Sequence, residues 1–489
     1  MSSGAQVAKN AAWLIGATTV NKVLAFVVFF VVARWAGPLV TGTFFFSISV
    51  TSVFVTLADL GMTPVIIRAI AADREDAARL LGAALKAKLI FIPLAIIGAM
   101  SYALMRHVDA VTLMTIAVAC AVMSADTVHL ILYGALRGKQ NLRPESIGMF
   151  IGQILTAVVT LIVAAIGGGP IWLAVGLLAG STWNVIWSIW NMRRFGIAWS
   201  AARWIDLRHL FQEAIPFAIA GIAVKLYSYV DSLLIQAHQG TYAVGMYAVA
   251  YKMTYALQFL PLTFSAALYP AFAASWKRQD HEGIQRTFLG SLRFLVAISF
   301  MLSSGLSALA SKIIPFIYGP HYIDAIAPFQ ILPWVLLPIF MDFPVGALMN
   351  ATHRAHLKTT AMVCTMVVNV IFNFILVPRL GPVGAAWSGV VSFWTLLFIG
   401  LWFTRKDAGW KGPMWILVRA TIVSGLSWVV WTVCLQLMPW IVAAIVGSVI
   451  AVGLGFASQL MTVNDLRFLK RLRRTRPDET DDETIHADT

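Results

Sequence analysis

The chain has 489 residues, of which 59% are apolar and only 12% are charged, and its mean hydropathy is +0.80. Soluble domains carry about 25% charged residues, so this composition excludes an ordinary soluble protein. The net charge of +14 would suit nucleic acid in a soluble chain. Positively charged inner loops of a membrane protein explain it more simply, and we expect no nucleic-acid partner.

Repeated apolar stretches of about 20 residues predict membrane-spanning helices. The expected fold is therefore an all-α polytopic membrane protein with about fourteen spans. Short connections separate them, and several contain a Gly-Pro pair such as Gly37-Pro38 or Gly381-Pro382. In chain order the expected spans are 12–33, 44–62, 85–104, 110–135, 146–166, 170–192, 213–236, 244–270, 289–317, 325–350, 358–378, 382–404, 413–437 and 440–461.

Basic residues lie mostly in alternate loops, whereas the loops between them carry few, namely Arg34, Arg106 and Arg379. Because positive charge stays on the cytoplasmic side, both termini are expected in the cytoplasm. The segment 462–489 contains the basic run KRLRRTRP, which is followed by the acidic and polar stretch DETDDETIHADT. We therefore expect a disordered tail there.

The sequence also contains an internal repeat. The segment that begins at Asn21 aligns with the one that begins at Val224, so that Gly37 matches Gly240, Gly42 matches Gly245 and Lys22 matches Lys225. Two six-helix units of the same orientation would relate by an axis along the membrane normal. This predicts two lobes around a central cavity, 1–192 and 213–404, joined by a cytoplasmic linker at 193–212 and followed by two further helices in 405–461.

Three lysines, Lys22, Lys225 and Lys252, lie well inside expected spans and away from the span ends. Lys22 is about 10 residues from either end of its span, or roughly 15 Å from each headgroup layer at 1.5 Å per residue. Lys225 occupies the matching place and Lys252 lies in the next span. A central lysine costs about 2.5–3.5 kcal/mol to insert. Each is therefore either paired with a carboxylate or exposed in a water-filled cavity for an anionic substrate.

Acidic residues within the spans are candidates for ion pairs or for coupling. Asp231 is the expected partner of Lys252, or alternatively a site for H⁺ or Na⁺. Asp126 and Asp342 match in the repeat, which predicts a shared structural role at a kink or a gate. Asp59 precedes Arg68, and we expect an ion pair at a gate or loop there.

Tyrosines cluster near Lys225 and Lys252, and Tyr229 and Tyr251 are candidate sugar contacts in a wet cavity. Asn21 completes the expected substrate-binding set. No Walker loop, zinc-protease motif or nucleophile elbow is present, so we expect a transporter and not an enzyme, with no metal site and no cofactor.

Five motifs, in order, resemble the polysaccharide-transporter branch of the multidrug/oligosaccharidyl-lipid/polysaccharide exporter superfamily, which includes the Wzx-type flippases. The resemblance covers residues 9 to 404. The motifs are LADLGMTPVIIRAIA, YGALRGKQNL, GMYAVAYKMTYALQFLPLTFSAALYPAFA, IYGPHYIDAIAPFQIL and NVIFNFILVPRLGPVGAAWSG.

The resemblance implies a V-shaped pair of six-helix bundles in the bacterial inner membrane. It implies flipping of an undecaprenyl-diphosphate-linked oligosaccharide from the cytoplasmic to the periplasmic leaflet by alternating access, for surface polysaccharide synthesis. The family's cationic cavity residues would map to Lys22, Lys225 and Lys252. Membrane lipids, a polysaccharide polymerase and a chain-length regulator are the other candidate partners.

The sequence leaves other functions open. Fourteen spans fit a lipid II-type flippase as well. A MATE-like cation-coupled antiporter shares the expected fold, although a site for cations should be acidic. A glycan polymerase or ligase would need a long outer loop, and a scaffold gives no reason for three lysines within the spans.

Overall fold

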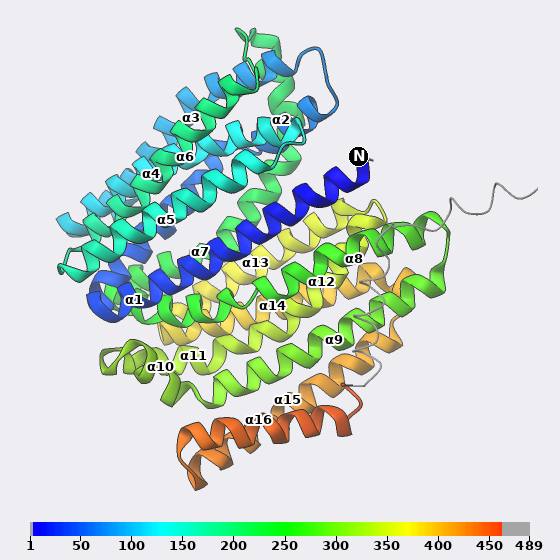
Figure 1. Ribbon diagram of the computed structural model, residues 1–489. Coiled ribbons are helices and arrows are strands. Elements are labelled where there is room, and N and C mark those ends of the chain that lie inside the picture. The colour runs from blue at the N-terminus through cyan, green and yellow to red at the C-terminus, as the bar shows by residue number, and fades with distance from the viewer. Residues whose placement is uncertain (1–2, 462–489) are drawn as a thin grey trace, which may run out of the picture. The chain divides into compact units, whose positions relative to one another are not determined.

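The computed structural model describes residues 3–461, and side chains from Val20 onward except those of residues 263, 266 and 267. The described part is built from helices (Figure 1). The helices are α1 (Ser3–Asp59), α2 (Met62–Ala71), α3 (Ala77–Met105), α4 (Ala110–Gly138), α5 (Arg143–Ala165), α6 (Pro170–Arg194), α7 (Trp204–Ala256), α8 (Phe259–Lys277), α9 (His281–Ala308), α10 (Ala310–Tyr318), η1 (Pro320–Ala325), α11 (Ile326–Ile331), η2 (Leu332–Val335), α12 (Leu336–Ala351), α13 (Ala355–Leu380), α14 (Pro382–Ala408), α15 (Lys411–Leu437) and α16 (Trp440–Ala457). The expected tail at 462–489 lies outside the described residues.

Twelve helical segments among the described residues are long and apolar enough to cross a membrane. Two of them, Val20–Asp59 and Trp204–Leu262, are far longer than the ~20 residues that one crossing needs. Each overlaps two of the fourteen expected spans. The prediction of an all-helical, multi-pass membrane protein is confirmed.

A glycine breaks each of these long helices at the boundary between the two spans. Gly37 in α1 has φ 80° and ψ 172°, and Gly240 in α7 has φ 79° and ψ −179°. A positive φ is accessible to glycine without the steric cost that a Cβ adds. The two residues that the repeat aligns therefore have the same backbone conformation.

Side chains from other helices cover the carbonyl groups that these breaks leave unbonded. Tyr322 donates its hydroxyl to Ala33 O at 2.8 Å. Next to it, Arg34 of α1 donates to Phe316 O and Ile317 O near the end of α10. At the second break, Arg106 donates to Ala237 O at 2.7 Å. Helix ends buried without such partners would be unstable, so these contacts fix both kinks.

The described chain packs as two units. Unit 1 comprises 3–259, 310–333 and 359–395, and unit 2 comprises 260–309, 334–358 and 396–461. This division follows packing and cuts through α13 and α14. The two lobes expected from the repeat, with their boundaries, stay a prediction.

In unit 1, helices α3 to α6 run side by side (Figure 1). Their apolar core continues into α2 and the start of α7, with Met62, Leu80, Ile131 and Leu210 fully buried. The connection before α7 is docked on α3, because Ser200 N donates to Ala78 O at 3.1 Å.

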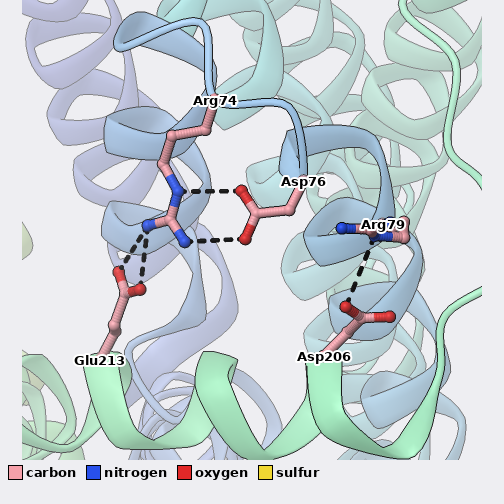
Figure 2. Close-up of polar contacts among 5 residues, drawn as sticks. All are labelled: Arg74, Asp76, Arg79, Asp206 and Glu213. Atoms are coloured by element: carbon pink, nitrogen blue, oxygen red, sulfur yellow. Dashed lines mark hydrogen bonds and ion pairs between the residues drawn. The ribbon is translucent and has the colours of Figure 1, made fainter.

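The loop between α2 and α3 is also held against α7, as Figure 2 shows. Arg74 donates to both oxygens of Asp76 and to Glu213, and Arg79 lies 3.6 Å from Asp206. The hydrogen bonds from Arg74 hold the pKa of Asp76 below its usual range, and those to Asp76 and Glu213 raise the pKa of Arg74.

In unit 2, α9 packs against α12, α15 and α16. Trp431 of α15 fits between Gly305 and Gly447, where a larger residue at Gly447 would collide with the indole ring. Two ion pairs join the helix ends: Arg354 donates to both oxygens of Asp407, at 2.8 and 2.9 Å, and Lys358 donates to Asp342 at 2.6 Å.

Candidate functional site

A cavity of about 450 Å³ lies within unit 1, among membrane-spanning helices α1, α4, α5, α6 and α7. This volume lies within the range of about 300–1,000 Å³ that is usual for small-molecule sites. Its polar lining residues are Asn21, Thr51, Ser52, Asp126, His129, Gln153, Thr156, Ser181, Asn184, Lys225 and Lys252.

Both lysines of the cavity come from α7, although they lie on opposite arms of that helix. A straight helix would separate Lys225 from Lys252 by about 40 Å, at 1.5 Å per residue. The break at Gly240 lies between them and lets both line the same space. The break at Gly240 therefore builds the cationic side of the cavity.

Neither cavity lysine forms an ion pair within 4.0 Å among the described residues. Lys225 Nζ lies 5.5 Å from the ring centre of Tyr229. Lys252 Nζ lies 5.7 Å from the ring of Phe29 and 5.5 Å from that of Phe45. Aromatic faces attract cations but leave the ammonium hydrogens free for an anionic partner.

The opposite wall is built from α4, α5 and α6, with pairs of polar residues at spacings of three. Asp126 and His129 share one face of α4, Gln153 and Thr156 one face of α5, and Ser181 and Asn184 one face of α6. Asp126 accepts a hydrogen bond from Ser181 Oγ at 2.6 Å and lies 3.7 Å from His129 Nδ1.

Glycines bring α5 and α6 close enough to form this wall. A methyl group at Gly180 would lie 2.1 Å from Thr156 Oγ1, and one at Gly152 would lie 2.4 Å from Asn184 Nδ2. The helices could not approach this closely with larger residues. The polar side chains of both helices consequently face the same space.

The cavity collects four of the predicted residues, Asn21, Lys225, Lys252 and Asp126. Asn21 is only 9% exposed, and its Oδ1 has no hydrogen-bond partner among the described residues. Lys22 is exposed and is not among the cavity-lining residues. Successive residues of a helix point about 100° apart, so α1 presents Asn21 and not Lys22 to this cavity.

The predicted tyrosines form a stack beside the cavity lysines. The rings of Tyr251 and Tyr255 lie 4.2 Å apart, and Tyr251 also packs against Tyr247 and Phe45. Tyr229 faces Lys225. Tyr229 and Tyr251 are not among the residues that line the cavity, and their role as sugar contacts stays a prediction.

The expected ion pair between Asp231 and Lys252 is absent from the described side chains. Asp231 is buried and accepts hydrogen bonds from Tyr247 Oη and from the backbone NH and hydroxyl of Ser232. Tyr247 follows Gly240, so this bond joins the two arms of α7. A role for Asp231 in ion coupling stays a prediction.

The expected ion pair of Asp59 exists with a different partner. Lys88 of α3 is 2% exposed and lies 3.2 Å from Asp59, whose carboxylate also accepts from Thr63. Arg68 instead lies over the ring of Phe217 at 5.3 Å. Asp126 and Asp342 are expected to share one role, but their surroundings differ. Asp126 lines the cavity beside Ser181 and His129. Asp342 forms an ion pair with Lys358.

Sequence reasoning missed the neutral polar residues on α5 and α6. A signal existed, because Gln153 with Thr156 and Ser181 with Asn184 are polar pairs at helical spacing within apolar spans. His129 also lines the cavity. Groups of three or more His, Cys, Asp or Glu that could hold a metal are not found in the described residues.

Comparison with known proteins agrees with this architecture. The Lipid II flippase MurJ of Bacillus subtilis is 21% identical, over 69% of this chain and 70% of that protein. The probable low-salt glycan biosynthesis flippase Agl15 of Haloferax volcanii is 21% identical, over 48% of this chain and 51% of that protein. An uncharacterized membrane protein of Methanocaldococcus jannaschii is 24% identical, and the match spans 42% of its length.

The solved structure of a Lipid II flippase MurJ in its inward closed conformation has the same fold. The TM-score is 0.72 at 13% identity, over 91% of this chain and 99% of that one. The family model described as Polysaccharide biosynthesis protein matches residues 7–276, which is more than half of the chain. The chain belongs to this polysaccharide biosynthesis protein family, in the polysaccharide-transporter branch that its motifs resemble.

Proposed function

We propose that the protein is a flippase for a polyprenyl-diphosphate-linked oligosaccharide. It moves this lipid from the cytoplasmic to the periplasmic leaflet of a bacterial inner membrane, with both termini in the cytoplasm. The observation that carries the proposal is the cavity among membrane-spanning helices. One side of this cavity has two lysines, and neither forms an ion pair with a described carboxylate. The other side has neutral polar side chains.

The lysines suit the phosphate part of such a lipid. No described carboxylate lies within 4.0 Å of either ammonium group, so the two groups favour an anionic ligand. A diphosphate carries about two negative charges. Charge-assisted hydrogen bonds between ammonium and phosphate are about twice as strong as neutral ones. A bound diphosphate would therefore offset the cost of holding Lys225 and Lys252 within the membrane.

The neutral side chains suit the sugar part. Hydroxyls and amides from α5 and α6 can replace the water that surrounds a sugar outside the membrane, and a polar group without such partners is costly in hydrocarbon. The polyprenyl chain is itself apolar and can stay in the bilayer. Two of the relatives, MurJ and Agl15, are named as flippases, which supports transport over enzymatic activity.

The two matched kinks support a mechanism of alternating access. Gly37 and Gly240 break α1 and α7 at equivalent places, and hinge motions commonly occur at a few such residues. Arms on either side of the breaks could then move while the rest of each helix stays packed. The cavity would open to one leaflet and then to the other.

A cation-coupled antiporter is the main alternative. Its cavity should be acidic to hold a cation, whereas this cavity contains Lys225 and Lys252 but only one carboxylate from the described residues, Asp126. The charge of the lining therefore favours an anionic substrate. A lipid II-type flippase is a narrower alternative, because its substrate would present the same phosphate chemistry to the lysines.

Reconstitution tests the proposal. Purified protein in liposomes would receive a fluorescent short-chain polyprenyl-diphosphate oligosaccharide in one leaflet, and an impermeant glycosidase would report how much reaches the other. We expect transfer well above that of protein-free liposomes, and no movement of a fluorescent organic cation under a proton gradient. Transport of the cation without transfer of the glycolipid would support the antiporter instead.

A further inference from the structure

The charges of the cavity are separated by helix. Its cations, Lys225 and Lys252, belong to α7, whereas its carboxylate, Asp126, belongs to α4. Asp126 and the lysines form no ion pair within 4.0 Å of each other among the described side chains. Lys225 is nonetheless close enough to attract the carboxylate of Asp126, so a ligand held by the lysines also lies near this carboxylate.

Asp126 is available to a ligand. Its side chain is 48% exposed, and Ser181 Oγ donates to its Oδ1 at 2.6 Å. No protein group in the described chain donates to its Oδ2. A half-exposed carboxylate oxygen inside a membrane cavity needs a hydrogen-bond donor, because an unmade bond there is costly.

The neighbouring groups reinforce this acceptor character. Asn21 lines the same cavity, is nine-tenths buried, and has an Oδ1 without a partner in the described chain. Gln153 lines the cavity as well, and its amide has no hydrogen bond to the described residues. An ionised carboxylate can only accept hydrogen bonds. This region accordingly suits a ligand that presents several donors, as the hydroxyl or amino groups of a sugar do.

The same carboxylate opposes an anion. Two carboxylates close together in a low-dielectric space repel strongly, and such like-charge contacts are a common source of specificity. With a diphosphate at the lysines, the cavity of about 450 Å³ is large enough to hold the sugar nearest the phosphate as well. That sugar would lie beside Asp126.

From this arrangement we propose that Asp126 selects the sugar attached to the diphosphate: a neutral or amino sugar is accepted, and an acidic sugar is rejected. This inference rests on the proposed flippase function. It concerns the first sugar, because the bond to the diphosphate at the lysines fixes the position of that sugar.

Binding measurements on the full chain in nanodiscs test the inference. The probes are short-chain polyprenyl diphosphates that carry glucose, glucosamine or glucuronate, together with the polyprenyl diphosphate that carries no sugar. We expect glucose and glucosamine probes to bind at least about tenfold more tightly than the glucuronate probe. Asp126→Asn should remove most of this difference, because glucuronate binding is strengthened when the like charge is lost and glucose binding is weakened when the charged acceptor is lost.

A matched control is Asp73→Asn, which removes an exposed carboxylate outside the cavity and should leave all four affinities unchanged. Equal binding of glucose and glucuronate by the unmodified protein would overturn the inference, and so would an unchanged ratio in a folded Asp126→Asn protein. In both cases binding of the sugar-free probe would leave the proposed function standing. Failure to bind any diphosphate probe would overturn the proposed function together with this inference.

Discussion

Gly42 of α1 and Gly245 of α7 pack against each other's helix in a reciprocal way. A methyl group at Gly42 would lie 1.9 Å from Thr241 O, and a methyl group at Gly245 would lie 2.1 Å from Pro38 O. Thr241 matches Pro38 in the repeat, as Gly245 matches Gly42. The contact thus has the pattern of a two-fold symmetric interface, in which each partner makes the same contact with the other.

Gly42→Ala or Gly245→Ala should therefore destabilise the protein. Overpacking costs about 1–3 kcal/mol where side chains can adjust, and here the added methyl meets backbone, so we expect a loss at the upper end of that range. Thermal unfolding in detergent measures it. Gly221→Ala on α7 is the control, because nothing lies within 4 Å of that position among the described residues. It should leave the midpoint unchanged or raise it slightly, because alanine favours a helix over glycine by about 0.5–1 kcal/mol. An unchanged midpoint for both contact variants would contradict the close approach.

The repeat and the glycine positions are predictable from sequence because they depend on the backbone. Gly37, Gly42, Gly240 and Gly245 stand at fixed offsets that a single chain reveals. The membrane spans are predictable for a related reason, since twenty apolar residues have few alternatives to a spanning helix.

The orientation of each helix about its own axis is not predictable in the same way. Lipid and protein core are both apolar, so a spanning helix shows little contrast between its faces. For this reason the sequence suggests both Asn21 and Lys22 as cavity residues, whereas the structure places only Asn21 in the cavity lining. Partners distant in the chain escape prediction for a similar reason: Asp59 pairs with Lys88, and Tyr247 with Asp231, across helix contacts that no local pattern reports.

The loop between α2 and α3 should show a pH-dependent contribution to stability. The pKa of Asp76 is lowered by the hydrogen bonds from Arg74, so the folded state favours the ionised carboxylate. This contribution is present above the unfolded pKa of about 3.9 and is lost as the pH falls through the lower folded pKa.

Arg74→Gln tests this contribution. The groups are partly exposed, so the loss at pH 7 should be small, about 1 kcal/mol or less. Unfolding of the variant and the unmodified protein should differ at pH 7, and the difference should shrink as the pH falls below about 4. Arg143→Gln is the control, because Arg143 is exposed and takes no part in these contacts of Arg74. A difference that persists unchanged to pH 3 would show that the ion pairs are not its source.

Double-mutant cycles should show whether Asp231 interacts with Tyr247 or with Lys252. Tyr247→Phe removes the hydroxyl that donates to Asp231, so Tyr247→Phe and Asp231→Asn should show a coupling energy of about 0.5–3 kcal/mol in unfolding. Lys252→Gln and Asp231→Asn should be additive within about 0.5 kcal/mol, because no ion pair joins these two described side chains. Strong coupling of Asp231 to Lys252 with none to Tyr247 would restore the partner expected from sequence.

Glycolipid transfer by lysine variants in liposomes tests the central claim most directly. If Lys225 and Lys252 hold the diphosphate, Lys225→Gln and Lys252→Gln should each lose most of the transfer, since truncating one partner of a buried charged contact costs about 2–5 kcal/mol. The charge-preserving Lys252→Arg should keep more of it than Lys252→Gln. Lys312→Gln, at an exposed position on α10, is the control for surface charge and should retain transfer. Lys22→Gln should also retain transfer, because Lys22 lies outside the cavity lining. Normal transfer by a folded Lys225→Gln/Lys252→Gln protein, with transfer abolished by Lys22→Gln, would contradict the account.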